Sequence, residues 1–177
     1  MTDKEIETDD IARPGRREFI VAGAAGAAGL VAAQALPGRV RAAAGSGEPA
    51  VYPVVEVARL ADLAPGATLD FAYPDDDSPA LLIRLTEPAE GGIGPGGDIV
   101  AFSILCTHKG CPVSYKAAHK MLICPCHWST FDPAKAGALV IGQASQGLPR
   151  IQLRIAGGSV QAVGVDGLIY GRHTNIL

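Results

Sequence analysis

Residues 106–127, CTHKGCPVSYKAAHKMLICPCH, decide the fold and the chemistry of this chain. The stretch holds all four cysteines and three of the four histidines of the sequence. Cys106 and His108 stand two positions apart, and Cys124 and His127 repeat this pair with one more residue between them. Two thiolates and two imidazoles in short loops are typical metal ligands, so the sequence predicts a metal centre here.

The order of these residues narrows the kind of metal centre. Each of two loops supplies one cysteine and one histidine, which suits an asymmetric two-iron cluster with one iron on two cysteines and the other on two histidines. A structural zinc site is an alternative. It usually pairs Cys with Cys and His with His on separate elements, and it does not need the two remaining cysteines. Two plain disulfides are a further alternative, and they would leave His108 and His127 without a role.

Both halves of the stretch resemble the Rieske family of [2Fe-2S] proteins, whose pattern is C-x-H-x-G-C followed by C-x-C-H. The pattern is complete here, including Gly110. The resemblance implies one [2Fe-2S] cluster per chain and an all-β fold, an antiparallel sandwich or barrel with a cluster-binding subdomain inserted at about 106–142. The implied cluster ligands are Cys106, His108, Cys124 and His127, and the implied disulfide joins Cys111 and Cys126.

Hydrophobic patterning over residues 45–177 favours an antiparallel sandwich or barrel, and the resemblance implies that these residues form a single Rieske domain. Ile151, Leu153 and Ile155 alternate with polar residues ahead of Gly157-Gly158, which is typical of a half-buried antiparallel hairpin. No segment shows sustained helical periodicity, and turn signals recur at short intervals. The other β-rich segments are Val51–Ala58, Thr68–Tyr73, Ala80–Thr86, Ile99–Leu105, Ala138–Ile141, Ser159–Val165 and Leu168–Gly171.

Residues after the second loop are expected to tune the cluster. Quinol-oxidising Rieske proteins carry a Ser and a Tyr there that hydrogen-bond to the cluster sulfurs; Ser129 matches the first, but Phe131 stands where the Tyr would be. Losing one such bond, worth about 1–2 kcal/mol, lowers the midpoint potential by roughly 40–90 mV. Gln143 also replaces a Pro of the family's Gly-Pro-Ala-Pro lid, and Trp128 stands where Gly is common. These departures argue against a quinol partner.

A narrower resemblance is to the small Rieske subunits of periplasmic arsenite oxidases. It rests on Cys106–Tyr115, Cys124–Asp132, and Gly142–Gln146 followed by Leu148-Pro149. It implies a molybdopterin-containing catalytic subunit that oxidises arsenite, while this chain is a non-catalytic electron-transfer subunit with no substrate site of its own. A cytochrome c or a small copper protein would then accept the electrons.

Two other Rieske functions remain as alternatives. The Rieske subunit of a quinol:cytochrome c oxidoreductase would need a retained membrane anchor, and Phe131 and Gln143 argue against it. The Rieske domain of an oxygenase system works in the cytoplasm and does not need the second cysteine pair, so Cys111 and Cys126 argue against that assignment.

The N-terminal residues 1–44 resemble a twin-arginine export signal behind a polar extension. Arg16-Arg17 precedes an uncharged run, Phe19–Gly38, and Ala42-Ala43-Ala44 resembles a cleavage site. We expect passage through the twin-arginine translocase and a periplasmic protein. A run of about 20 apolar residues can also span a bilayer, so a retained signal would associate the protein with the membrane.

The charge balance excludes one class of partner. Lys and Arg number 15 against 18 Asp and Glu, giving a formal net charge of -3 over 177 residues. No basic run is interleaved with aromatic residues. We therefore expect no nucleic-acid partner.

Overall fold

A computed structural model describes residues 51–176, so the predicted export signal at 1–44 lies outside the described residues. Short 3-10 turns occur at Leu60–Asp62 and Pro133–Lys135. Within residues 51–176, no helix is long and apolar enough to cross a membrane. The strands are β1 (Val55–Arg59), β2 (Thr68–Ala72), β3 (Pro79–Arg84), β4 (Ile99–Ser103), β5 (Ser114–Lys116), β6 (Met121–Ile123), β7 (Thr130–Asp132), β8 (Ala138–Ile141), β9 (Arg150–Ala156) and β10 (Ser159–Asp166).

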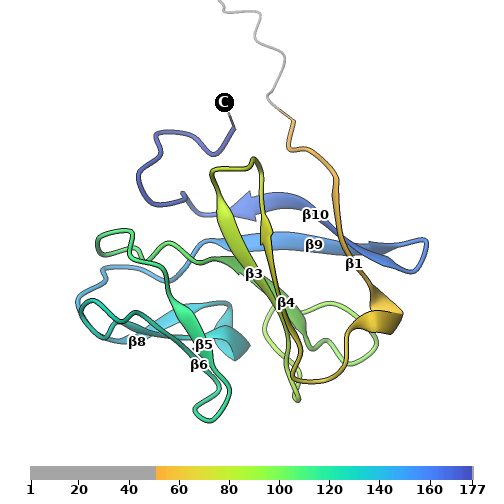
Figure 1. Cartoon of the computed structure of the whole chain (residues 1–177), viewed down its shortest axis with the longest axis horizontal. Helices are drawn as coiled ribbons and strands as arrows, with labels where there is room; N and C mark the ends of the chain where they lie inside the picture. The colour runs from red at the N-terminus through yellow and green to blue at the C-terminus, as the bar shows by residue number, and fades with distance from the viewer. Residues whose placement is uncertain (1–50, 177) are drawn as a thin grey trace, which may run out of the picture. The chain divides into compact units, whose positions relative to one another are not determined.

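The strands form two antiparallel sheets (Figure 1). A six-stranded sheet has the order β1-β10-β9-β4-β3-β2, and we call it the basal sheet. A four-stranded sheet has the order β5-β6-β7-β8 and, with its connecting loops, forms the cluster-binding subdomain, residues 106–149. The chain enters this subdomain after β4 and returns to the basal sheet at β9. The predicted all-β antiparallel fold class is confirmed.

Strands β3 and β4 lie between two hydrophobic cores, which explains why they lack alternation. All five residues of β4 are buried. Val100 and Phe102 pack in one core together with residues of the cluster-binding subdomain. Ile99 and Ala101 point the other way, into the core that β9 and β10 cover. The subdomain therefore rests on one face of the β3–β4 pair, and its position is fixed by buried apolar contacts.

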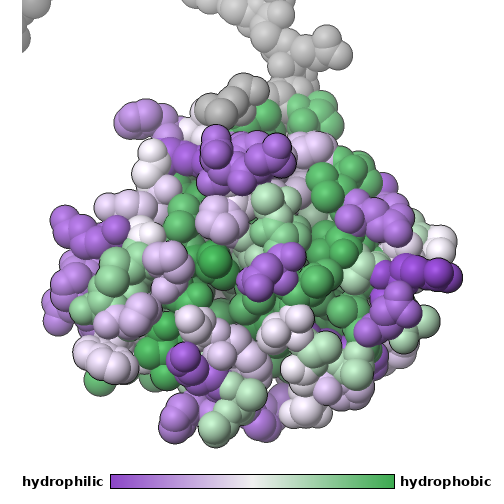
Figure 2. All heavy atoms as spheres, viewed as in Figure 1, coloured by the Kyte–Doolittle hydropathy of each residue, from purple (hydrophilic) through white to green (hydrophobic). Residues whose placement is uncertain are grey.

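The β9–β10 hairpin forms where the alternating pattern predicted it. Gly157 and Gly158 both have positive φ, +58° and +81°, as a two-residue turn between antiparallel strands requires. Ser159 pairs with Ala156 directly across the turn. Figure 2 shows this face of the molecule, where hydrophobic and hydrophilic side chains are intermixed and most of the hydrophilic ones lie toward the periphery.

The prediction of a strand at Leu168–Gly171 was wrong. Gly167, with φ +90°, ends the pairing of β10. The backbone N–H of Ile169 donates to the side chain of Asn175 at 2.9 Å, so no neighbouring strand takes it. Arg172 then donates to both carboxylate oxygens of Asp75 at 2.6 Å, which ties this loop to the β2–β3 hairpin.

Candidate metal centre

Three loops meet at one end of the small sheet: residues 106–113, 124–129 and 142–149, which we call the first, second and third loops. The row of paired residues at this end shows how they converge. Thr130 pairs with Ile141 on one side and with Ile123 on the other. The second loop leaves β6 after Ile123 and the third leaves β8 after Ile141, so the two loops start on either side of Thr130 on β7.

The first and second loops share one backbone pattern. The N–H of Gly110 donates to the carbonyl of Cys106 at 2.8 Å, and the N–H of Trp128 donates to the carbonyl of Cys124 at 3.1 Å. Gly110 and Trp128 both have positive φ, +73° and +61°. The N–H of Cys106 donates to the carbonyl of Cys111 at 3.0 Å, and the N–H of Cys124 donates to the carbonyl of Ser129 at 2.9 Å. Each loop thus wraps its backbone around one cysteine.

Two of the four cysteines remain as free thiols, and both are buried. Cys106 is 1% exposed and Cys124 is 2% exposed, and both belong to the same buried core. Burial raises the pKa of the Cys106 thiol, although the backbone N–H of His108 acts against the shift. A metal bound by these sulfurs must therefore displace protons from them.

The two loop histidines lie together at the surface side of the thiols. The ring centroids of His108 and His127 are 4.7 Å apart, with an angle of 79° between the planes. His108 is half-buried and His127 is exposed, in contrast to the buried cysteines. Two buried thiols and two less buried imidazoles from the same two loops match the donor set of an asymmetric cluster whose irons have different ligands.

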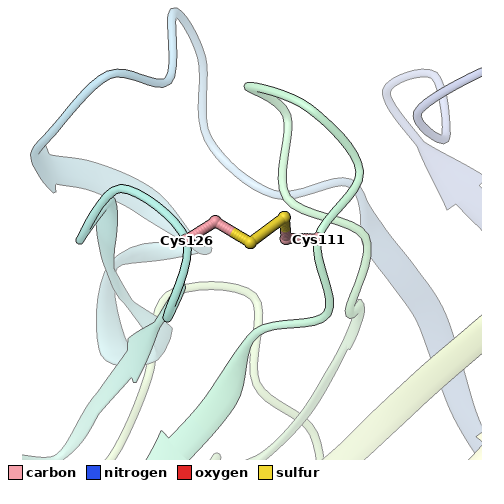
Figure 3. Close-up of a disulfide and its surroundings, with 2 residues drawn as sticks. All are labelled: Cys111 and Cys126. Carbon is pink, nitrogen blue, oxygen red and sulfur yellow. A yellow bond between two sulfur atoms is a disulfide. The ribbon is translucent and has the colours of Figure 1, made fainter.

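The remaining cysteines, Cys111 and Cys126, are joined in a disulfide between the first and second loops (Figure 3). Their Cα atoms are 6.5 Å apart. The sulfur of Cys124 lies within 4.8 Å of both disulfide sulfurs, which gives a group of three sulfurs with metal-site spacing. Disulfide sulfurs are not thiolates, however, and thiolates are the form that binds metal. The free pair, Cys106 and Cys124, is therefore the set of sulfurs suited to iron.

Ser129 connects the second loop to the third loop and to the thiols. Its Oγ accepts hydrogen bonds from the N–H groups of Gln143 at 3.1 Å and Ala144 at 3.0 Å. Its hydroxyl also interacts with the Cys106 sulfur. A side chain at Gly142 would place its Cβ 2.4 Å from the Cα of Ser129, so only glycine permits this approach.

Phe131 is fully buried in the core that also contains Cys106 and Cys124. It lies on β7, opposite Leu122 on one side and Leu139 on the other. The ring therefore contributes apolar packing below the thiols, where the family resemblance would place a tyrosine.

Two contacts at the site were not predicted from the sequence. Thr107 is buried, and its hydroxyl donates to the carbonyl of Gln146 at 2.8 Å, which ties the first loop to the third. The ring of Tyr170 lies against Gly110, where a Cβ would come within 2.6 Å of it. In the sequence, Gly110 was the only signal of a close approach at this point, and it did not identify Tyr170 as the residue that approaches.

His119 is exposed in the β5–β6 turn, between Lys116 and β6.

Comparison with known proteins gives a family that agrees with this geometry. Residues 53–152 match the Rieske [2Fe-2S] domain, and the chain belongs to this family. It is 43% identical over 163 residues to the iodate reductase subunit IdrB of Denitromonas iodatirespirans, covering 90% of this chain and 85% of that one. The corresponding subunit of Pseudomonas sp. (strain SCT) is 40% identical over 159 residues, covering 88% and 81%.

A solved structure is also similar. The soluble domain of the Rieske protein II (soxF) from Sulfolobus acidocaldarius superimposes with a TM-score of 0.61 at 26% identity, covering 69% of this chain and 82% of that chain. The predicted Rieske fold and [2Fe-2S] cofactor are confirmed. The chain is a Rieske electron-transfer protein of the kind found as an oxidoreductase subunit.

Proposed function

We propose that this chain is the electron-transfer subunit of an oxyanion oxidoreductase, with its cluster held by Cys106, His108, Cys124 and His127. One observation carries the assignment: the two loops supply two buried free thiols and two paired imidazoles, while the other two cysteines are already joined to each other. When bound, a Rieske cluster accepts and releases one electron at a time.

The positions of the ligands divide their roles. The thiolates of Cys106 and Cys124 would hold one iron in a water-excluded core. The neutral imidazoles of His108 and His127 would bring less negative charge to the other iron than thiolates, which would make reduction easier and raise the potential. His127 is exposed, so the electron has a short route to a docked protein. All four ligands are protein side chains, which leaves no open position for substrate chemistry.

Because this site only carries electrons, substrate chemistry belongs to another chain. We propose a molybdopterin-containing catalytic subunit as that partner, with a cytochrome c or a small copper protein at the other end of the electron path. The sequence motifs favour arsenite as the substrate, in which case electrons enter this chain from the catalytic subunit. We further propose export by the twin-arginine route and work in the periplasm, with membrane association if the signal is retained.

A second substrate, iodate, is favoured by a different observation. Two relatives that span most of this chain carry the name of an iodate reductase subunit. Iodate is reduced, so electrons would pass from this chain to the catalytic subunit. Arsenite and iodate therefore predict opposite directions of electron flow through the same ligands.

The ligand assignment is tested by single substitutions. We expect Cys106→Ala, His108→Ala, Cys124→Ala and His127→Ala each to abolish the Rieske signal in electron paramagnetic resonance and to lower the bound iron. His119→Ala, which changes an exposed histidine of the same subdomain, should keep both. A Rieske signal of full intensity in any of the four variants would contradict the assignment.

The substrate is tested on the complex isolated from its native host. If arsenite is the substrate, adding it should reduce the oxidised Rieske centre, whereas iodate should leave the reduced centre unchanged. If iodate is the substrate, it should reoxidise a prereduced centre, and arsenite should have no effect.

A further inference from the structure

Trp128 occupies a place in the second loop that glycine fills in the first loop. Gly110 and Trp128 each donate their N–H to the carbonyl of the cysteine four positions earlier, and each has a left-handed backbone. Glycine adopts this conformation without steric cost, while a residue with a Cβ is strained there. The same backbone turn thus tolerates a tryptophan at a cost to the stability of this chain.

The side chain of Trp128 is not buried within the described residues, so packing does not offset this strain. The residue is 71% exposed, the most exposed large hydrophobic residue in residues 51–176 after Val51. Its backbone position is fixed, because its carbonyl accepts from the hydroxyl of Thr130 at 3.1 Å. A strained and exposed indole next to His127 indicates a contact with another molecule.

Two further exposed apolar residues lie on β8, the edge strand that pairs with β7 directly after this loop. Ile141 is 68% exposed and pairs directly with Thr130. Val140 is 57% exposed and is the extra residue of an irregularity in the β7–β8 pairing. The third loop then brings Gly142 against the backbone of Ser129, the residue after Trp128. Trp128, Val140 and Ile141 therefore form one apolar edge, which we call the tryptophan edge.

The loops around the tryptophan edge are nearly free of charge. Residues 106–113, 124–129 and 142–149 contain a single charged residue, Lys109, although 19% of the whole chain is charged. Interfaces between permanent subunits are depleted in charge at their centre and enriched in tryptophan and other large apolar residues. Docking surfaces for transient electron carriers are smaller, and association with such carriers is steered mainly by charge.

We propose that the tryptophan edge and the three loops form the permanent interface with the catalytic subunit, and that Trp128 inserts into an apolar pocket of that subunit. The inference rests on the proposed function, since it takes the catalytic subunit as the occupant. It adds the surface that binds the partner and the residue that anchors it. His127 precedes Trp128 in the chain, so the same contact brings the histidine side of the cluster up to the partner.

The test compares variants of the complex isolated from the native host through a tag on this chain. The probe is the molybdenum-containing subunit that co-purifies with the wild-type chain. Trp128→Gly suits the left-handed backbone, so its thermal midpoint and its Rieske signal should be at least as good as those of the wild type. We expect its Kd for the catalytic subunit, measured by dilution in mass photometry, to rise about 30-fold or more, as for a central tryptophan anchor.

Ile141→Thr has a matched control in the basal sheet. We expect Ile141→Thr to raise the Kd about fivefold. Ile155, on β9 near the Gly157-Gly158 turn, is 39% exposed, so Ile155→Thr makes the same chemical change in the basal sheet, away from the loops. It should leave the Kd unchanged.

The outcomes separate this inference from the proposed substrate. A complex that oxidises arsenite and has the same Kd in wild type, Trp128→Gly and Ile141→Thr would overturn the interface while leaving the function intact. A complex that is inactive with arsenite but dissociates in Trp128→Gly would keep the interface and reject arsenite. Absence of any molybdenum-containing subunit from the wild-type preparation would overturn the inference together with its proposed partner.

Discussion

The basal sheet and the cluster-binding subdomain are held together in different ways. Strands of the basal sheet are 5–8 residues long, and β9 and β10 alone share seven paired positions. Strands of the subdomain are 3–4 residues long, and β6 and β7 share two. The subdomain compensates with specific connections: the Cys111–Cys126 disulfide, the Ser129 hydrogen bonds and the Thr107–Gln146 contact. Both regions bury apolar side chains, and in the subdomain these individual cross-links also shape the site.

The two regions also differ in charge. Residues 106–149 contain four lysines and one aspartate, a net charge of +3 with histidines neutral. Residues 51–105 and 150–176 together contain five arginines and ten acidic residues, a net charge of -5. Only Lys109 of these four lysines lies in the three loops, and Lys120 pairs with Glu87 at 2.9 Å, so most of the positive charge of the subdomain lies outside the site.

The largest expected effect comes from removing apolar volume in the basal core. Ile151 is 1% exposed, and we expect Ile151→Ala to lower the free energy of unfolding by about 2–5 kcal/mol. Chemical denaturation followed by circular dichroism measures this loss. The midpoint potential should stay unchanged, because the residue packs in the core away from the loops. A shifted potential would show that the two regions are not separable in this way.

Removing the disulfide tests the cross-links of the other region. The bond closes a loop with a sequence separation of 15, for which chain entropy gives about 3 kcal/mol. We expect the double change Cys111→Ser and Cys126→Ser to lower the temperature at which the cluster is lost, followed by its visible absorbance. The basal sheet should still unfold at a similar denaturant concentration. If the double change destabilised the basal sheet as much as it destabilised the cluster, the two regions would unfold as one unit.

Ser129→Ala tests whether single hydrogen bonds set the potential. The hydroxyl interacts with the Cys106 sulfur and accepts two backbone N–H groups from the third loop. We expect the midpoint potential to fall by roughly 40–90 mV, which corresponds to one bond of about 1–2 kcal/mol. Ser145→Ala, at an exposed position of the same loop, should leave the potential unchanged. A redox titration that gives equal values for Ser129→Ala and wild type would contradict this role.

Phe131→Tyr is the reverse change, adding a donor below the thiols. The ring is fully buried in the same core as Cys106 and Cys124. We expect the potential to rise by up to the same roughly 40–90 mV, because the new hydroxyl stabilises the reduced cluster. Phe71→Tyr, on the basal strand β2, is the control and should have no effect. An unchanged potential in Phe131→Tyr would remove the explanation for the family difference at this position.

The smallest expected effect concerns the ion pair that ties the C-terminal loop to the basal sheet. The hydrogen bond from Arg172 lowers the pKa of Asp75. A carboxyl with a lowered folded pKa stabilises the protein above its unfolded pKa, about 3.9, and this stabilisation is lost as the pH falls through the folded pKa. The Asp75 side chain is 33% exposed, so we expect Asp75→Asn to cost at most about 1 kcal/mol at pH 7. Thermal unfolding at pH 7 and near pH 3 should show the difference shrinking in acid.

The sequence predicted the strands of the basal sheet better than the strands of the cluster-binding subdomain. Alternation at Ile151, Leu153 and Ile155 was sufficient for the β9–β10 hairpin, because one face of that hairpin is buried. Strands β5, β6 and β7 are too short for any periodicity to identify them, and the motif located them only as loops between ligands. The strand predicted at Leu168–Gly171 failed because Asn175 takes the backbone N–H that a strand would have paired.

Within the site, the motif indicated the six cysteines and histidines that the structure brings together. It did not reveal the contact of Thr107 with Gln146 or of Tyr170 with Gly110, since both depend on residues from other loops. The sequence also did not predict the left-handed backbone of Trp128, although a tryptophan is unusual for the family at this position.

The most direct test of the central claim is electron paramagnetic resonance on the natively isolated, oxidised complex, before and after adding arsenite and, separately, a quinol. The account predicts a Rieske-type signal that appears with arsenite and not with quinol. Reduction by quinol alone would assign the chain to a quinol:cytochrome c oxidoreductase, and absence of the signal even with dithionite would contradict the cluster itself.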